Sequence, residues 1–393
     1  MNRYCIYVLL SCILLAGSPA SYAQGENNHW YFGMGHHLNF NANPPAYTSN
    51  TSIATFESSA AVSDAQGNLL FYTIGCRIWD RNGNEMPNAT GLQGNYPGNP
   101  VAGNKGSGQD CVQTLPNPAN KNQYFVFSAN SWEEQSDTIF YHIVDMTLNG
   151  GLGDVVPSSK NTVLFAGTTP NSITEFMTVA YADCNHYWYI VTMAAPYNYA
   201  YYAYKVDENG VSNTPVVSVP TVTTGYNIVH GLTKILPQSQ KAYRTCQNGL
   251  LRSDFNKYTG QFTNFEIIPG INSLRFEFSP NEQLLYIINP LGLQQMNMAL
   301  YPNVAAIASS AVIIGLGGNG SDLRLGPDGK IYRASTSNGA LGRIELPNVL
   351  GTGCTYTPAF VNTTSQTQLM RLGAKALRRT SIDTIINPYP IPE

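Results

Sequence analysis

The sequence predicts an all-β protein that folds as a seven-bladed β-propeller, with six or eight blades as alternatives. A pattern of short apolar strands and turn residues recurs along the chain with a spacing of about 40 to 60 residues, which is typical of propeller blades. The composition includes 25 Tyr but only 11% charged residues, which is typical of exported β proteins. The N-terminal copy of the pattern lacks a first strand, so the two ends of the chain can close one ring.

The first 23 residues have the pattern of a signal peptide. Arg3 supplies a positive charge, residues 5–16 are apolar, and residues 21–23 (Ser-Tyr-Ala) form a cleavage signal. We therefore expect a mature start near Gln24 and export to the cell surface or the medium, with the periplasm as the alternative. The apolar run is too short for a transmembrane helix. Residues 24–377 then form one propeller domain, followed by a tail of residues 378–393.

Residues 60–83 contain the clearest copy of the blade pattern, as a strand, a turn, a strand, a turn and a strand. Residues 63–68 (Ser-Asp-Ala-Gln-Gly-Asn) and residues 80–83 (Asp-Arg-Asn-Gly) are typical turns. Related copies occupy residues 115–151, 182–210, 236–260, 278–288 and 326–332, and an incomplete copy occupies residues 30–40. We expect the first strand that residues 30–40 lack to come from residues 367–377, which makes seven blades.

Several of these motifs are specific enough to carry a family resemblance. Residues 30–33 (Trp-Tyr-Phe-Gly), 63–73, 78–88 and 144–155 resemble the N-terminal propeller of large exported proteins of the Bacteroidetes. Those proteins usually continue into immunoglobulin-like repeats and a gliding-motility-associated C-terminal domain that the type IX secretion system recognises. The resemblance implies a secreted or cell-surface role. The sequence up to Glu393 contains neither such repeats nor a sorting domain, so we do not expect surface attachment by that route.

Other motifs do not predict a cofactor or a metal site. Residues 315–320 match the dinucleotide pattern G-x-G-x-x-G, but a strand pattern follows instead of the required helix, so we expect a loop between blades. The Asp-x-Asn-Gly segments at 80–83 and 207–210 lack the carboxylates of a calcium loop. The six His have no metal-ligand spacing. A net charge of −3 without a long Lys/Arg run excludes a broad surface for nucleic acid.

One alternating register of the innermost strands is polar, and we predict that it faces the central channel. This register supplies the candidate binding residues, while the other register packs between blades. A solvated channel wall without a ligand is the alternative. The candidates are Glu57, Gln109, Gln113, Glu175, His230, Lys234, Arg275, Glu277, Asp322 and Arg324.

Removal of the signal leaves five cysteines in an oxidising compartment, an odd number. Cys76 follows the second strand of its blade and Cys111 begins the first strand of the next, so both are expected at the same face. We therefore predict one disulfide, Cys76 to Cys111. Five buried thiols are the alternative.

The sequence identifies no catalytic motif, and it predicts a binding or scaffold module with an undefined protein or glycan partner. A carbohydrate-binding module is one alternative, because the aromatic clusters at residues 187–189 and 197–204 could stack on sugar rings. Aromatic residues also pack between blades, which is the other interpretation of these clusters. A propeller lyase or hydrolase is a further alternative, and it requires acid, base or metal groups that converge at the channel mouth.

Overall fold

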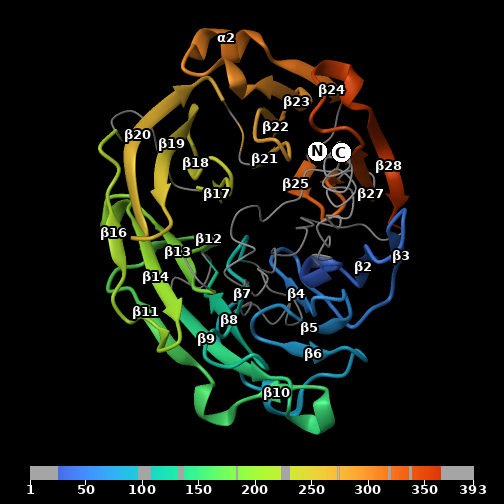
Figure 1. Cartoon of the computed structure of the whole chain (residues 1–393), viewed down its shortest axis with the longest axis vertical. Helices are drawn as coiled ribbons and strands as arrows, with labels where there is room; N and C mark the ends of the chain where they lie inside the picture. The colour runs from blue at the N-terminus through green and yellow to red at the C-terminus, as the bar shows by residue number, and fades with distance from the viewer. Residues whose placement is uncertain are drawn as a thin grey trace, which may run out of the picture.

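Seven antiparallel β-sheets follow one another around a central axis, which confirms the predicted all-β seven-bladed propeller (Figure 1). The structure is a computed structural model, and it describes residues 25–95, 108–131, 137–182, 185–222, 231–271, 273, 275–316, 320–335 and 339–363. We number the sheets as blades 1 to 7 in chain order. The first strands of neighbouring blades contact one another near the axis, for example β7 with β12 and β12 with β17.

The first three blades contain strands β1 to β11. Blade 1 consists of β1 (His29–Phe32), β2 (His36–Asn39) and β3 (Ala46–Thr48), and blade 2 of β4 (Ala60–Ser63), β5 (Leu69–Thr73) and β6 (Ile78–Asp80). Blade 3 consists of β7 (Gln113–Pro116), β8 (Gln123–Ala129), β9 (Thr138–Asp145), β10 (Asp154–Val155) and β11 (Thr162–Ala166). Both β10 and β11 pair with β9, so two short strands share the outer position.

Blades 4 to 7 contain the remaining strands. Blade 4 consists of β12 (Ile173–Tyr181), β13 (Tyr187–Met193), β14 (Tyr201–Asp207), β15 (Gly210–Val211) and β16 (Val216–Ser218), and blade 5 of β17 (Thr233–Ile235), β18 (Lys241–Cys246), β19 (Gly249–Asn256) and β20 (Gln261–Pro269). Blade 6 consists of β21 (Arg275–Phe278), β22 (Leu284–Asn289), β23 (Gly292–Asn297) and β24 (Val312–Leu316). Blade 7 consists of β25 (Gly320–Leu325), β26 (Ile331–Ser335), β27 (Ala340–Ile344) and β28 (Tyr356–Asn362).

The helices of the described chain are short, and all except η2, which precedes β1, lie between strands. They are α2 (Val304–Ser309) and the 3-10 helices η2 (Gly25–Asn27), η3 (Pro87–Ala89), η6 (Asn149–Gly151), η7 (Pro157–Ser159), η8 (Ala195–Tyr197), η9 (Met298–Leu300) and η10 (Gly351–Cys354). Within the described ranges, no helix has the length and apolarity needed to cross a membrane.

Short polar side chains fix the turns of the blades. Asp80 Oδ1 accepts hydrogen bonds from the backbone N–H groups of Asn82 at 2.8 Å and Asn84 at 3.0 Å. This is the arrangement in which an Asp side chain stabilises a tight turn. The carboxylate is therefore occupied by backbone donors, and residues 80–83 form a turn as predicted. The dinucleotide-like pattern likewise ends in a strand, because β25 begins at Gly320.

Aromatic side chains pack between neighbouring blades. The rings of Phe127 and Tyr189 stack with centroids 4.1 Å apart between blades 3 and 4, and those of Tyr201 and Phe262 stack at 4.1 Å between blades 4 and 5. Each of these four side chains is almost completely buried. Large buried aromatic rings contribute strongly to a core. For Tyr189 and Tyr201, this packing supports the interpretation of the Tyr clusters as part of the core.

Blade 7 packs directly on blade 1, so the ring closes between the first and last described blades (Figure 1). Trp30 of β1 meets Tyr332 of β26 with ring centroids 5.4 Å apart, and Phe32 and Leu341 belong to the same buried cluster. The strand predicted at residues 367–377 lies outside the described residues. Within the described residues, side-chain packing between blades 1 and 7 closes the ring.

Candidate binding groove at the channel mouth

Polar residues of the first strands meet across the axis of the ring. Arg275 of blade 6 donates a hydrogen bond to Gln109, and its guanidinium lies 5.0 Å from the ring centroid of Phe176 in blade 4. Blade 5 stands between blades 4 and 6, so this contact is possible only close to the axis (Figure 1). The side chain of Arg275 therefore lies close to the axis of the propeller.

Lys234 and Glu277 form an ion pair that joins three consecutive blades. Lys234 Nζ of β17 lies 2.7 Å from Glu277 Oε2 of β21, and the same oxygen accepts a hydrogen bond of 2.9 Å from the backbone N–H of Leu325 in β25. Glu277 Oε1 accepts another, of 3.0 Å, from the N–H of Phe278. The side chains of Lys234 and Glu277 are 18% and 10% exposed. Since both groups are largely buried and hydrogen-bonded, the pair holds the inner strands of blades 5, 6 and 7 together.

Arg324 is held less tightly than Lys234. Its Nη2 lies 3.4 Å from Asp110 Oδ1 and 3.7 Å from Asp322 Oδ2, which are long distances for charge-assisted hydrogen bonds. Its Nε is buried and has no hydrogen-bond partner among the described residues. Asp110 precedes blade 3 whereas Arg324 belongs to blade 7, so this contact also spans the axis.

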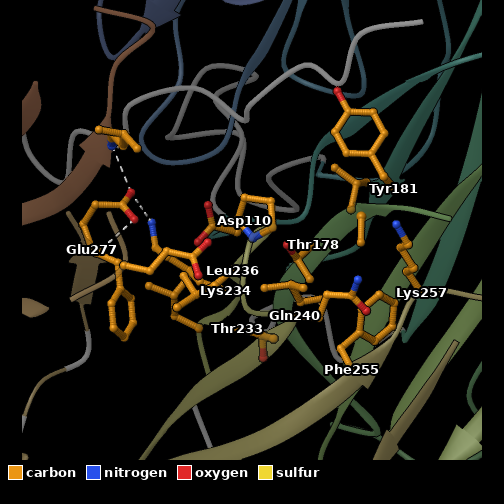
Figure 2. A pocket seen from close by; sticks show the side chains of 18 of the residues that line it. Asp110, Thr178, Tyr181, Thr233, Lys234, Leu236, Gln240, Phe255, Lys257 and Glu277 are labelled. Carbon is orange, nitrogen blue, oxygen red and sulfur yellow. Dashed lines mark hydrogen bonds and ion pairs between the residues drawn. The ribbon is translucent and has the colours of Figure 1, made fainter. Parts of the chain in front are cut away.

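A groove with a cavity volume of about 220 Å³ begins beside these ion pairs and runs between β12 and β17 (Figure 2). We call it the β12–β17 groove. Its long walls are residues 177–182 and 232–237, and residues 277–280 complete it. Asp110, Lys234 and Glu277 lie at the end near the axis, whereas Phe255 and Lys257 lie at the outer end (Figure 2). The turns between the first and second strands of blades 4, 5 and 6 surround it, so it lies at the mouth of the channel.

The predicted polar register divides into two groups of described residues. Gln113, Lys234, Glu277 and Arg324 line the groove. Glu57, Gln109, Glu175, Arg275 and Asp322 do not line it, and all of these except Gln109 are buried. His230 lies outside the described residues. The binding role of these residues stays a prediction.

The sequence interpretation missed Asp110 and the wall formed by residues 177–182. Asp110 belongs to the register that was expected to pack between blades, but it precedes β7 and forms a parallel bridge with Phe176 of β12. Because β7 begins only at Gln113, strand alternation does not extend back to Asp110. The turn-like residues 103–110, rich in Gly, Asn and Asp, were a signal that the strand starts later.

The predicted disulfide between Cys76 and Cys111 is wrong, because the two residues are buried thiols that are not bonded to each other. Cys76 Sγ donates a weak hydrogen bond to the backbone oxygen of Asn95 at 3.8 Å. The side chain of Asn95 binds the oxygen of Ile74 and the N–H of Gly108, next to Cys111. Asn95 thus occupies the region between the two cysteines. The prediction placed them at the same face but could not anticipate this intervening segment.

Burial raises the pKa of the Cys111 thiol well above its ordinary value, and the carboxylate of Glu175 adds to the effect. The thiol is therefore protonated at neutral pH and is not an activated nucleophile. Among the described residues, no cluster of three or more His, Cys, Asp or Glu could hold a metal ion.

Comparisons with known proteins give only distant structural likenesses. No protein-family model and no curated protein matches the chain. A provisional 6-phosphogluconolactonase of Bacteroides fragilis is 9% identical, with a TM-score of 0.48 over 90% of this chain and 99% of that chain. A second one, of Bacteroides uniformis, is 11% identical, with a TM-score of 0.45 over 88% and 99%. The C-terminal WD40 domain of Sif2 is 11% identical, with a TM-score of 0.47 over 88% and 86%. Likenesses this distant assign no ligand or activity to this chain.

Proposed function

We propose that this protein is an exported ligand-binding module and that its ligand occupies the β12–β17 groove. The observation that carries the proposal is a groove at the channel mouth with mixed walls. Apolar side chains such as Leu236 and Phe255 alternate there with polar groups such as Thr178 and Gln240 (Figure 2). Binding sites commonly combine a mainly apolar surface with a few polar groups that orient the ligand.

The charges of the groove support binding of a ligand without a large net charge. The acidic side chains that line it are Asp110, Glu277 and Glu282, and the basic ones are Lys234, Lys257 and Arg324. These formal charges cancel, so the groove has no excess of cations for phosphate groups. Because Lys234 and Glu277 already bond to each other and to backbone groups, they act more readily as a fixed wall than as a proton-transfer pair.

A variant with a filled groove tests this proposal. The mature protein is screened against a glycan array and a phage library of random peptides, and each bound ligand is measured again on Thr178→Trp. Thr178 lies in the groove wall, so a Trp there should abolish binding, whereas Val217→Trp on the exposed outer strand of the same blade should leave it intact. Absence of any ligand in both screens, or equal binding to Thr178→Trp and wild type, contradicts the proposal. Urea unfolding of both variants controls for loss of the fold.

Export is supported by the signal-peptide pattern and by the resemblance to exported Bacteroidetes propellers. We expect protein from the native host to begin near Gln24, outside the cytoplasm. N-terminal sequencing of the exported protein tests this, and an intact Met1 on that protein contradicts it.

A further inference from the structure

The edge of strand β12, rather than one of its two faces, borders the groove. Val179 packs its side chain on the apolar cluster between blades 3 and 4, whereas Ala180 packs on the cluster between blades 4 and 5. Both residues nevertheless line the groove. Successive side chains of a strand point to opposite faces, so two neighbouring residues share a cavity when the backbone edge faces it. The backbone between Met177 and Ala182 is therefore exposed to the groove.

The hydrogen-bond pattern of β12 determines which backbone groups point into the groove. Glu175 and Met177 bond to Asp110, on the side away from β13, whereas the N–H of Ala182 bonds to His186 in the hairpin with β13. The register from Met177 to Tyr181 is regular. In an antiparallel pair, successive residues direct their N–H and C=O groups alternately toward the partner strand and away from it. The N–H and C=O of Val179 therefore point toward the groove.

The chain itself pairs with the first part of this edge. The N–H of Asp110 donates to the oxygen of Glu175 at 2.9 Å, and the N–H of Met177 donates to the oxygen of Asp110 at 3.4 Å. The side chain of Gln113 donates to the oxygen of Met177 at 3.0 Å. The segment from Asp110 to Gln113 thus already forms a strand-like contact with β12, and this contact ends before Val179. The groove begins where this internal partner ends.

We propose that the ligand of the β12–β17 groove is an extended peptide that adds as a further strand to the edge of β12. This inference rests on the proposed binding function. The part of this edge that the internal partner leaves free, from Thr178 to Ala182, measures about 16 Å at 3.3 Å per residue, which suits a segment of about three to five residues. Main-chain hydrogen bonds give such a contact its affinity, and pockets for alternate side chains give it specificity. Leu236 and Phe255 favour an apolar side chain at every second position.

N-methylation of the peptide backbone tests the inference directly. Phage displaying random heptapeptides are selected on the mature protein, and the enriched sequence is synthesised with one N-methyl group at each position in turn. Strand addition predicts alternation: methylation at every second residue weakens binding by about tenfold, because it removes a main-chain donor, and methylation between these positions has less than a threefold effect. Equal tolerance at all positions, no enriched peptide, or binding of glycans alone overturns the inference.

Two variants of Val179 supply the matching test on the protein. Val179→Pro removes a donor that points to the groove without removing a hydrogen bond to β13, and it should weaken peptide binding by about tenfold. Val179→Ala retains the N–H and should bind within threefold of wild type. Equal binding of the two variants contradicts strand addition. If Val179→Pro does not fold, the methylation series on wild type decides. A glycan ligand lost in Thr178→Trp would refute the peptide while supporting the groove.

Discussion

Replacement of Lys234 by Met should destabilise the propeller substantially, because the Glu277 carboxylate then loses its cation. This carboxylate lies where blades 5, 6 and 7 meet, and its side chain is only 10% exposed. Removal of one partner of a fully buried ion pair typically costs about 3 to 5 kcal/mol. Two features reduce that cost here: Glu277 retains the hydrogen bonds from the N–H groups of Leu325 and Phe278, and Lys234 is partly exposed. We therefore expect the free energy of unfolding to fall by about 2 to 3 kcal/mol.

Urea unfolding followed by tryptophan fluorescence measures this change. The matched control is Lys241→Met in the same blade, whose ion pair with Asp254 is about one-third exposed on both sides and should contribute at most about 1 kcal/mol. The double variant Lys234→Met with Glu277→Gln removes the unpaired charge, and it should recover about 1 kcal/mol relative to Lys234→Met alone. A loss below about 0.5 kcal/mol for Lys234→Met, or one equal to that of the control, would refute the structural role of the pair.

Three further predictions concern the packing of the blades. Gly260→Ala should lower the free energy of unfolding in urea by about 2 kcal/mol, because φ is +72° and a Cβ would lie 2.6 Å from the indole of Trp188. Gly270→Ala, where φ is +81° and a Cβ would have no heavy atom within 4 Å, should lower it by only about 1 kcal/mol. Equal losses would count against the clash with Trp188. Burial, reinforced by His29, lowers the pKa of His37 from 6.5 to about 4. The folded state therefore favours the neutral ring, so the contribution of His37 to the free energy of unfolding is fully present above pH 6.5 and falls by up to about 3 kcal/mol as the pH drops to 4. His37→Gln should flatten the dependence of stability on pH over this range, and an unchanged slope would contradict the role of His37. Cys76 and Cys111 should both be alkylated in protein that is unfolded without reductant. Protection of both residues from alkylation would instead show that they form a disulfide.

The blade pattern was predictable because each strand and turn is encoded locally. Apolar runs such as residues 69–73 alternate with turns in which an Asp side chain binds the backbone, and these signals do not depend on distant parts of the chain. The number of blades follows from counting these units. Fold class was therefore accessible from the sequence.

The site was only partly predictable because it depends on contacts between distant blades. Lys234 and Glu277 belong to the expected polar register, but their ion pair depends on the approach of β17 and β21. Asp110 was missed because it precedes a regular strand, where alternation does not apply. The exposed edge of Val179 could not be inferred either, because the residue has an ordinary apolar side chain and its backbone faces the groove. Sequence patterns describe side chains and do not identify which backbone groups remain available.

Hydrogen exchange measured by mass spectrometry tests the central claim most directly, using the mature protein with and without the ligand selected in the screens. The ligand-binding groove predicts slower exchange in segments that contain residues 177–182 and 232–237, which form its two long walls. The exposed outer strands β16 and β24 should exchange at unchanged rates. Slower exchange confined to outer strands, with both groove walls unchanged under saturating ligand, would contradict the claim.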